Sequence, residues 1–352
     1  MEDQVSSLSR REATFCLAAL GVSLALPAAA QRAATAGRGG TVFTADEGAA
    51  AISAIDLATG RVTATRISIA PHNVQATADG RRLLALGVAV AGPHGPGHRS
   101  AGAGRLVVLE PVAGGAPRAV AEIAAGHHPA HVVADAAGRI AYATDAEADA
   151  LLVLDLEAGR ALAPVRVGDY PHGLRLTPDG REAWIANVKD GSVSVVDVGR
   201  GAEVARVPVG PSPVQVGFVP DGSRAYVSLR GADAVAEIDA ASRRVTRRIA
   251  VGRGPVQVFA TPDGRLLYVA NEGTRTAPGS TVSAVDVAAG AVAATIETGL
   301  GAHGVVVAGD GRRAYVTNLY DGTVAEIDTA AQTVTRRFRV GRTPNGVTWV
   351  AG

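Results

Sequence analysis

Short runs that mix apolar and polar residues alternate with turn residues along most of this chain. Within residues 169–210 (DYPHGLRLTPDGREAWIANVKDGSVSVVDVGRGAEVARVPVG), such runs cover 174–177, 182–187, 192–196 and 203–209. Asp and Gly residues begin the turns between the runs, as is typical of hairpins. This pattern predicts four short antiparallel strands joined as a meander.

The same unit recurs at a nearly fixed spacing. Copies start at residues 127, 169, 211, 253, 300 and 342, which are 42 residues apart with one 47-residue exception. A period of this size indicates an array of supersecondary units. A four-stranded sheet cannot bury both faces alone, and radial stacking of such sheets produces a β-propeller.

The number of blades follows from the acids that end the third strands. There are seven of them: Asp56, Glu110, Asp155, Asp197, Asp239, Asp286 and Asp328. We interpret them as turn residues that bond their own backbone. The C-terminal segment GVTWVAG has the pattern of a lone first strand, whereas TVFTADE, AAISAID and RVTATRISI near the N-terminus supply strands two to four. Together they complete one blade and leave no free sheet edge between the chain's ends.

The predicted fold is therefore all-β. Residues 39–352 are expected to form a seven-bladed propeller of four-stranded antiparallel blades, closed by the C-terminal strand joining three N-terminal strands. Aromatic residues recur in the second strands, where we expect packing between blades rather than ligand stacking: Phe43, Tyr142, Trp184, Tyr226, Tyr268 and Tyr315. Polar residues recur where these strands end, as turn caps or, alternatively, as ligand contacts: Asp46, Asp145, Asn187, Asn271 and Asn318.

The N-terminus has the layout of an export signal. Arg10 and Arg11 precede the apolar run 15–26, and Ala28 to Ala30 offer a cleavage site. We assign residues 1–30 to a cleavable signal of twin-arginine type and 31–38 to a linker, with no membrane anchor after cleavage. The mature chain would then be periplasmic or extracellular. The only cysteine of the sequence, Cys16, lies within the signal, so the mature chain would have no thiol.

The motifs YVTN at 315–318 and YVAN at 268–271, together with the Asp-Gly turns, resemble the YVTN family of β-propeller repeat proteins, close to YncE-like proteins. The resemblance covers about residues 39–352. It implies a seven-bladed, usually exported propeller without shared catalytic residues. Blade two departs from the motif, because LLALGVAV occupies residues 83–90.

All eight histidines map to one face of the expected propeller. His72, His127, His128, His131, His172 and His303 flank the starts of first strands, and His94 and His98 lie in the insertion 91–104. A second insertion, 272–280, is expected as a loop on the same face. Because first strands line the channel, two rings of side chains are expected at its mouth. The first ring is His72, Ala130, His172, Val214, Val256, His303 and Asn345, and the second is Asn73, His131, Gly173, Gln215, Gln257, Gly304 and Gly346.

The main functional hypothesis is an exported, non-catalytic module that binds a small molecule or a protein at this mouth. Its predicted ligand-binding residues are His72, Asn73, His131, His172, Gln215, Gln257, His303 and Asn345. One alternative is a propeller that binds Cu or Zn, with the imidazoles of His72, His131, His172 and His303 as ligands. Another is a hydrolase or lyase of the lactonase type with a histidine base. No catalytic residue is assigned, because the sequence has no nucleophile elbow, phosphate-binding glycine loop or paired-carboxylate motif.

Composition narrows the expected partners. The formal net charge is +1, and arginines are scattered through the repeats, so the chain has no basic patch suited to nucleic acid. We expect a monomer.

Overall fold

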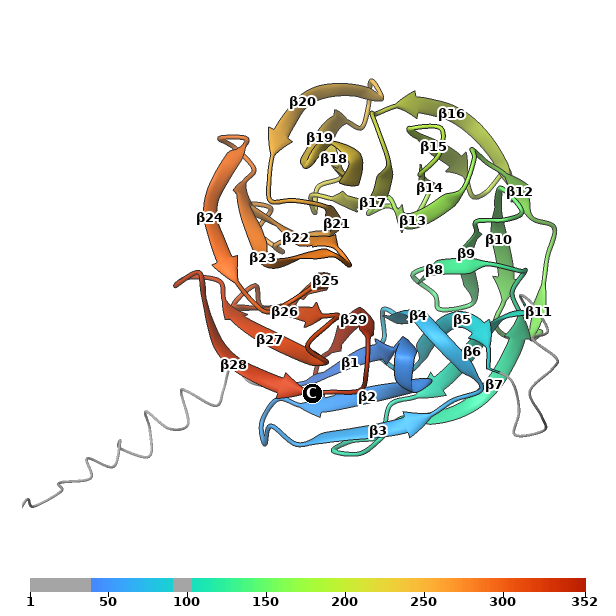
Figure 1. The fold of residues 1–352 in the computed structure, drawn as a ribbon. Helices are drawn as coiled ribbons and strands as arrows, with labels where there is room; N and C mark the ends of the chain where they lie inside the picture. The colour runs from blue at the N-terminus through green and yellow to red at the C-terminus, as the bar shows by residue number, and fades with distance from the viewer. Residues whose placement is uncertain (1–38, 91–102) are drawn as a thin grey trace, which may run out of the picture. The chain divides into compact units, whose positions relative to one another are not determined.

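Seven antiparallel sheets surround a central channel (Figure 1). The computed structural model describes residues 39–90 and 103–352. Contacts divide the chain between residues 36 and 37, and the sheets belong to the second unit. The predicted seven-bladed, all-β propeller is confirmed. Helix is confined, within the part described, to the 3₁₀ turns η1 (Glu47–Ala49) and η2 (Arg230–Ala232).

Within each blade the strands are ordered from the channel outward. Blade one has β29 (Pro344–Val350), β1 (Thr41–Asp46), β2 (Ala51–Asp56) and β3 (Val62–Arg66). Blade two has β4 (Ile69–Ala76), β5 (Leu83–Ala89), β6 (Gly104–Glu110) and β7 (Arg118–Ala124). Blade three has β8 (Pro129–Ala134), β9 (Ile140–Asp145), β10 (Ala150–Asp155), β11 (Arg160–Ala161) and β12 (Val165–Arg166). Blade four has β13 (Pro171–Leu176), β14 (Glu182–Asn187), β15 (Ser192–Asp197) and β16 (Ala202–Pro208). Blade five has β17 (Pro213–Phe218), β18 (Arg224–Leu229), β19 (Ala234–Asp239) and β20 (Arg244–Ala250). Blade six has β21 (Pro255–Ala260), β22 (Leu266–Thr274), β23 (Ala277–Asp286) and β24 (Ala291–Glu297). Blade seven has β25 (Ala302–Val307), β26 (Arg313–Asn318), β27 (Thr323–Asp328) and β28 (Thr333–Arg339).

The ring closes by strand exchange between the chain's two ends. β29 pairs antiparallel with β1, and Thr41 lies opposite Val350 while Phe43 lies opposite Thr348. Three N-terminal strands and one C-terminal strand therefore form blade one, as the sequence predicts. The exchange leaves neither end of the ring as a free sheet edge.

Apolar side chains from neighbouring blades pack together and hold the ring. In one cluster, Trp184 and Val195 of blade four meet Val216 and Val227 of blade five. The six aromatic residues of the second strands are all buried. Some of them also bond through their polar group, as when the Tyr226 hydroxyl donates to Glu237 Oε2 at 2.9 Å. Their predicted role in packing is confirmed.

The acids that end the third strands are turn residues in six blades. The Asp239 carboxylate, for example, accepts from the Ser242 backbone N–H at 2.8 Å and from its hydroxyl at 2.6 Å. Glu110 in blade two differs, because its longer side chain accepts from Arg118 Nη2 at 2.5 Å. The turn interpretation holds for the aspartates.

Two segments differ from the expected four-strand pattern. The outer strand of blade three is split into β11 and β12, which flank Pro164, a residue with no backbone N–H to donate to β10. The insertion 272–280 is not a loop, because β22 continues to Thr274 and β23 begins at Ala277, so the expectation of a loop is wrong. It extends blade six as a β-hairpin, with Gly273 opposite Pro278.

Several predictions concern residues outside those described. They are the export signal 1–30, the linker 31–38, Cys16, and the histidines His94 and His98. In the part of the chain that is described, no helix is long and apolar enough to cross a membrane.

Candidate active site at the mouth of the channel

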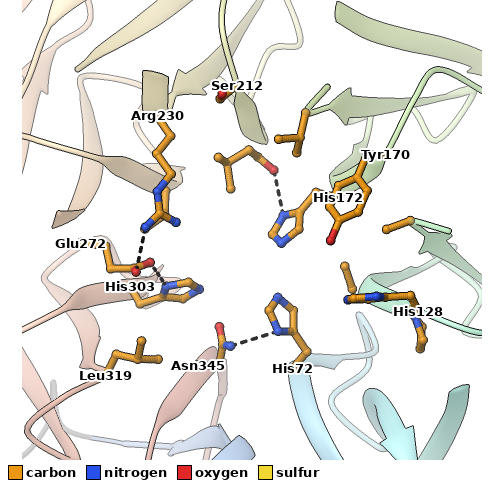
Figure 2. A pocket seen from close by; sticks show the side chains of 16 residues that line it. His72, His128, Tyr170, His172, Ser212, Arg230, Glu272, His303, Leu319 and Asn345 are labelled. Carbon is orange, nitrogen blue, oxygen red and sulfur yellow. Dashed lines mark hydrogen bonds and ion pairs between the residues drawn. The ribbon is translucent and has the colours of Figure 1, made fainter. Parts of the chain in front are cut away.

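A cavity of about 440 Å³ opens where the innermost strands meet (Figure 2). All seven residues of the first predicted ring line it: His72, Ala130, His172, Val214, Val256, His303 and Asn345. They stand near the starts of the innermost strands, most of them at the second residue. The repeat spacing therefore positions them, since equivalent residues of successive blades face the same channel.

A second set of equivalent positions forms the cavity wall. Each lies directly after the residue that ends the second-strand motif, where the pairing between the second and the innermost strand ends. Its members in the cavity are Ala146, Val188, Arg230, Glu272 and Leu319. In each case the backbone N–H donates to the carbonyl of the residue just before the innermost strand of the same blade, at 2.8–3.0 Å. Glu47 N makes the same bond to Thr343 O at 3.0 Å. Backbone hydrogen bonds thus hold five wall positions at the cavity, and Glu47 at the equivalent position of blade one, whatever side chain each carries.

The structure divides the eight predicted binding residues into two levels. His72, His172, His303 and Asn345 line the cavity. The other four are buried beyond its lining: Asn73, His131, Gln215 and Gln257. Gln215 Nε2 approaches His131 Nδ1 at 3.4 Å, and Asn73 Oδ1 accepts from Val132 N at 3.4 Å. This inner level packs the channel below the cavity.

Three of the histidines form a compact cluster. The ring centres of His131 and His172 are 4.9 Å apart, those of His72 and His172 are 5.3 Å apart, and those of His72 and His131 are 5.6 Å apart. One nitrogen from each ring lies within 4.8 Å of the others. His303 stands farther away, with its ring centre 6.5 Å from that of His72. The structure therefore groups three of the four predicted metal ligands and separates His303 from them.

Burial keeps two rings of the cluster neutral. Desolvation, together with the neighbouring His172 and His72, holds the pKa of His131 well below its usual value. Desolvation also lowers the pKa of His172 to about 3, with a further contribution from His72, although a bond to the Val214 carbonyl opposes the shift. His172 Nδ1 donates that bond at 3.2 Å. Its Nε2 therefore carries the lone pair.

His303 belongs to a separate charged group. Its Nδ1 lies 2.7 Å from Glu272 Oε2, and Arg230 Nη2 donates to Glu272 Oε1 at 3.0 Å. Burial alone would raise the pKa of Glu272, but the hydrogen bond and charge of His303, together with Arg230, lower it to about 2. The carboxylate is therefore ionised at neutral pH and accepts Nδ1–H from His303. Figure 2 shows the second ring nitrogen of His303 directed toward the middle of the cavity.

Sequence reasoning missed the charged partners of the histidines. Glu272 and Arg230 belong to the site, as does Glu47, whose Oε2 accepts from Asn345 Nδ2 at 2.8 Å. A signal is present in the sequence, because each directly follows the repeated position at the end of a second-strand motif: Glu47 follows Asp46, Arg230 follows Leu229, and Glu272 follows Asn271.

The polar residues that recur at the ends of the second-strand motifs make hydrogen bonds within their own blades. Asn187 Nδ2, for example, donates to Ser192 Oγ and Ser194 Oγ, both at 2.9 Å. Asp145 accepts from the backbone N–H groups of His127 and His128 at 2.9 and 3.0 Å. These contacts favour the turn-capping role over the ligand-binding alternative.

Comparison with known proteins gives a family match and several structural neighbours. The sequence model of the family described as "Lactonase, 7-bladed beta-propeller" matches residues 121–308. No curated protein matches the chain.

The structural neighbours share the fold at low sequence identity. A putative 6-phosphogluconolactonase from Bacteroides fragilis is 15% identical, with a TM-score of 0.73 over 90% of this chain and 99% of that one. The periplasmic gluconolactonase of Pseudomonas aeruginosa is 18% identical, with a TM-score of 0.71 over 89% and 99%. A chain of the hydrazine synthase of Kuenenia stuttgartiensis is 19% identical, with a TM-score of 0.67 over 80% and 95%. Because the family match spans more than half of the 352 residues, the chain belongs to the seven-bladed lactonase β-propeller family.

Proposed function

We propose that this protein hydrolyses lactones in the cavity at the channel mouth, with His303 as the general base. The observation that carries this proposal is the buried pair of His303 and Glu272, joined at 2.7 Å within the cavity of a lactonase-family propeller. A carboxylate that holds Nδ1–H of a histidine fixes the tautomer whose Nε2 accepts a proton.

The reaction needs only water and the lactone. His303 Nε2 removes a proton from water as the water oxygen adds to the lactone carbonyl carbon. The tetrahedral species then expels the ring oxygen, and the ring C–O bond breaks. That oxygen takes the proton from the His303 imidazolium, which gives the open hydroxy acid and restores the neutral ring.

Glu272 and Arg230 prepare His303 for this role. The ionised Glu272 stabilises the imidazolium that forms during the reaction, and Arg230 keeps Glu272 ionised. His172 is poorly suited to act as the base, because a ring whose pKa is about 3 has little affinity for a proton at neutral pH.

The charges at the cavity favour a neutral lactone over a phosphorylated one. Among the cavity-lining residues described, Arg230 is the one Arg or Lys side chain, and it is paired with Glu272. The wall also includes the apolar residues Val188, Val214 and Leu319. A phosphate dianion would meet the Glu272 carboxylate without a free cation, among those described residues, to bind it.

Export of the mature chain belongs to the same proposal. The predicted signal at residues 1–30 supports it, as does the structural likeness to a periplasmic gluconolactonase. Among β-propeller proteins, the YVTN and YVAN motifs support a close relationship of this chain to the YVTN repeat proteins.

The test is direct assay of lactone hydrolysis. Purified protein is given glucono-1,5-lactone, its 6-phosphate and a panel of five- and six-membered lactones, and acid release is followed with a pH indicator after subtraction of the spontaneous rate. We expect turnover of the neutral lactone. His303→Ala should lower kcat by roughly 10²–10⁴-fold, the usual contribution of a general base.

His127→Ala is the matched control. This exposed histidine lies on the same face but does not line the cavity, so its loss should leave turnover unchanged. Folded protein without activity on the panel would overturn the proposal and favour the non-catalytic binding module. Full activity in His303→Ala would overturn the assigned base.

A further inference from the structure

Three adjacent blades bring His72, His131 and His172 together, and their arrangement matches that of a metal centre. With Zn–N bonds of about 2.0–2.1 Å and tetrahedral angles, three imidazole ring centres lie about 5.2 Å from one another. The observed separations are 4.9, 5.3 and 5.6 Å. The candidate ligand nitrogens lie within 4.8 Å of one another, compared with about 3.3 Å in a tetrahedral site, so the rings would have to turn toward a common point to bind the ion.

The buried nitrogens of this cluster lack partners. Nε2 of His72 and Nε2 of His131 are both inaccessible to solvent and make no hydrogen bond to the described chain. His131 is 1% exposed. A buried polar atom without a partner is costly, and such atoms in a native protein commonly mark a bound water or ion.

The opposite nitrogens are held by groups that orient the rings. Nδ1 of His172 donates to Val214 O at 3.2 Å, whereas Nδ1 of His131 lies 3.4 Å from Gln215 Nε2, an amide nitrogen that can only donate. Nδ1 of His72 lies 3.1 Å from Asn345 Nδ2, which can only donate, and 3.6 Å from the Glu47 carboxylate, which can accept the Nδ1 proton when Nε2 binds a metal. Metal-binding histidines usually donate their second N–H to an acceptor. His172 does so already, whereas metal binding by Nε2 of His72 and His131 requires the Asn345 and Gln215 amide nitrogens to turn away from Nδ1.

We propose that His72, His131 and His172 bind one divalent transition metal ion, with Zn²⁺ as the preferred ion. Three neutral imidazoles suit Zn²⁺, Cu²⁺ and Ni²⁺, and a tetrahedral arrangement favours Zn²⁺ among them. His303 is not a ligand of this site, because its ring centre lies 6.5 Å from that of His72 and outside the cluster of three. His72 and His172 line the cavity, so the bound ion would border it.

This site is independent of the proposed hydrolysis, because its ligands are not the residues assigned to proton transfer. The two proposals can therefore fail separately. The competing occupant of the cluster is a water molecule hydrogen-bonded to the rings.

The experiment measures binding of the metal alone. Full-length protein is stripped with a chelator and titrated with Zn²⁺ by calorimetry, and bound metal is counted by elemental analysis after dialysis. We expect one ion per chain and a rise in Tm with Zn²⁺ concentration, as ligand binding to the folded state requires. Co²⁺ in the same site should give the intense visible absorption of four-coordinate Co²⁺.

The variants are chosen to separate ligation from folding. His131→Phe retains a ring without a ligand atom, and His172→Ala removes a ligand at the cavity, where the residue is half-buried. Each should lower Zn²⁺ affinity at least ~100-fold, as loss of one of three protein ligands implies. His303→Ala should still bind one ion. Absence of the high-affinity ion in folded wild-type protein, or one-to-one binding that survives both ligand substitutions, would overturn the proposal and favour water in the cluster.

Discussion

The residue that ends the second-strand motif is an amide in some blades and a carboxyl group in others, and this difference makes the free energy of unfolding depend on pH. Asn187, Asn271 and Asn318 occupy the repeated position with a neutral amide, whereas Asp46 ends β1 with a carboxyl group that is buried. Asp46 accepts from Thr44 at 2.8 Å, Ser53 at 2.5 Å and Gly341 N at 3.1 Å. Burial outweighs these bonds and raises its pKa to about 6.

The raised pKa of Asp46 predicts a pH-dependent loss of stability. Between about pH 4 and 6 the folded chain retains a proton that the unfolded chain has released, so the free energy of unfolding falls as pH rises through this window. The full loss is about 3 kcal/mol for a shift of roughly two pKa units. Asp46→Asn should remove this component and stabilise the protein above pH 6, as measured by urea unfolding at pH 4 to 8. The reciprocal control, Asn318→Asp, should add a similar loss, and an unchanged pH profile in Asp46→Asn would contradict the assignment.

Glu272→Gln tests the partner of the proposed base. The amide keeps a hydrogen-bonding group near His303 but loses the charge that stabilises its imidazolium. We expect kcat on the lactone to fall by roughly 10²–10⁴-fold with little change in KM, since the effect is on proton transfer. The measurement is steady-state kinetics beside thermal unfolding. A proportional rise in KM with constant kcat would instead indicate that Glu272 only binds substrate.

At the level of elements, the extended hairpin of blade six positions the charged group of the site. Glu272 lies in β22, and the hairpin continues through Gly273 opposite Pro278 and Thr274 opposite Ala277. Arg253 Nη2 donates to Ala277 O at 2.8 Å and ties the hairpin to the start of its own blade. Gly273 has φ +68°, and a Cβ there would lie 2.3 Å from Gly279 N.

Gly273→Ala should therefore disturb the hairpin and displace Glu272. The matched control is Gly180→Ala, which has a similar φ of +71° but no atom within 4 Å of the added methyl group, in a turn of blade four that does not line the cavity. Both substitutions share the backbone strain, which is of the order of 1 kcal/mol. Only Gly273→Ala should lower lactone turnover. The comparison requires kinetics and Tm for both variants, and equal turnover in the two would show that Glu272 does not depend on the hairpin.

The sequence alone predicts the elements better than the contacts between them. Periodicity places His72, His172, His303 and Asn345 at one level, because equivalent residues of stacked blades must face the same channel. It cannot pair Glu272 with His303, since that contact depends on how far a side chain from blade six reaches toward blade seven. The segment 272–280 has the pattern of a loop because Gly, Thr and Pro interrupt its alternation, and only the pairing with the opposite strand shows a hairpin.

At the level of the propeller unit, residues 39–352 close on themselves. β29 completes blade one, and a Cβ on Gly352 would lie 2.8 Å from Gly40 N. The two described ends are therefore neighbours. Strand exchange within a blade closes the ring with main-chain hydrogen bonds, whereas a cut between blades would leave only side-chain packing at the junction.

Circular permutation tests how much this exchange contributes. One permutant joins Gly352 to Gly39 through a short glycine linker and opens the chain between Asp179 and Gly180, so that β13 is still exchanged into blade four. A second opens it between Gly168 and Asp169, where no strand is exchanged. The first should unfold in urea as cooperatively as the natural order, and the second should be less stable. Equal stability of the two would show that packing alone closes the ring.

The wall of the cavity is held by five backbone hydrogen bonds that do not depend on the side chains facing a bound molecule. Because main-chain atoms make those bonds, substitution of Ala146, Val188 or Leu319 changes what a bound molecule meets without removing any of the bonds that hold the wall. A propeller of this kind can acquire new specificities one blade at a time. Divergent activities among such proteins then require no change in architecture.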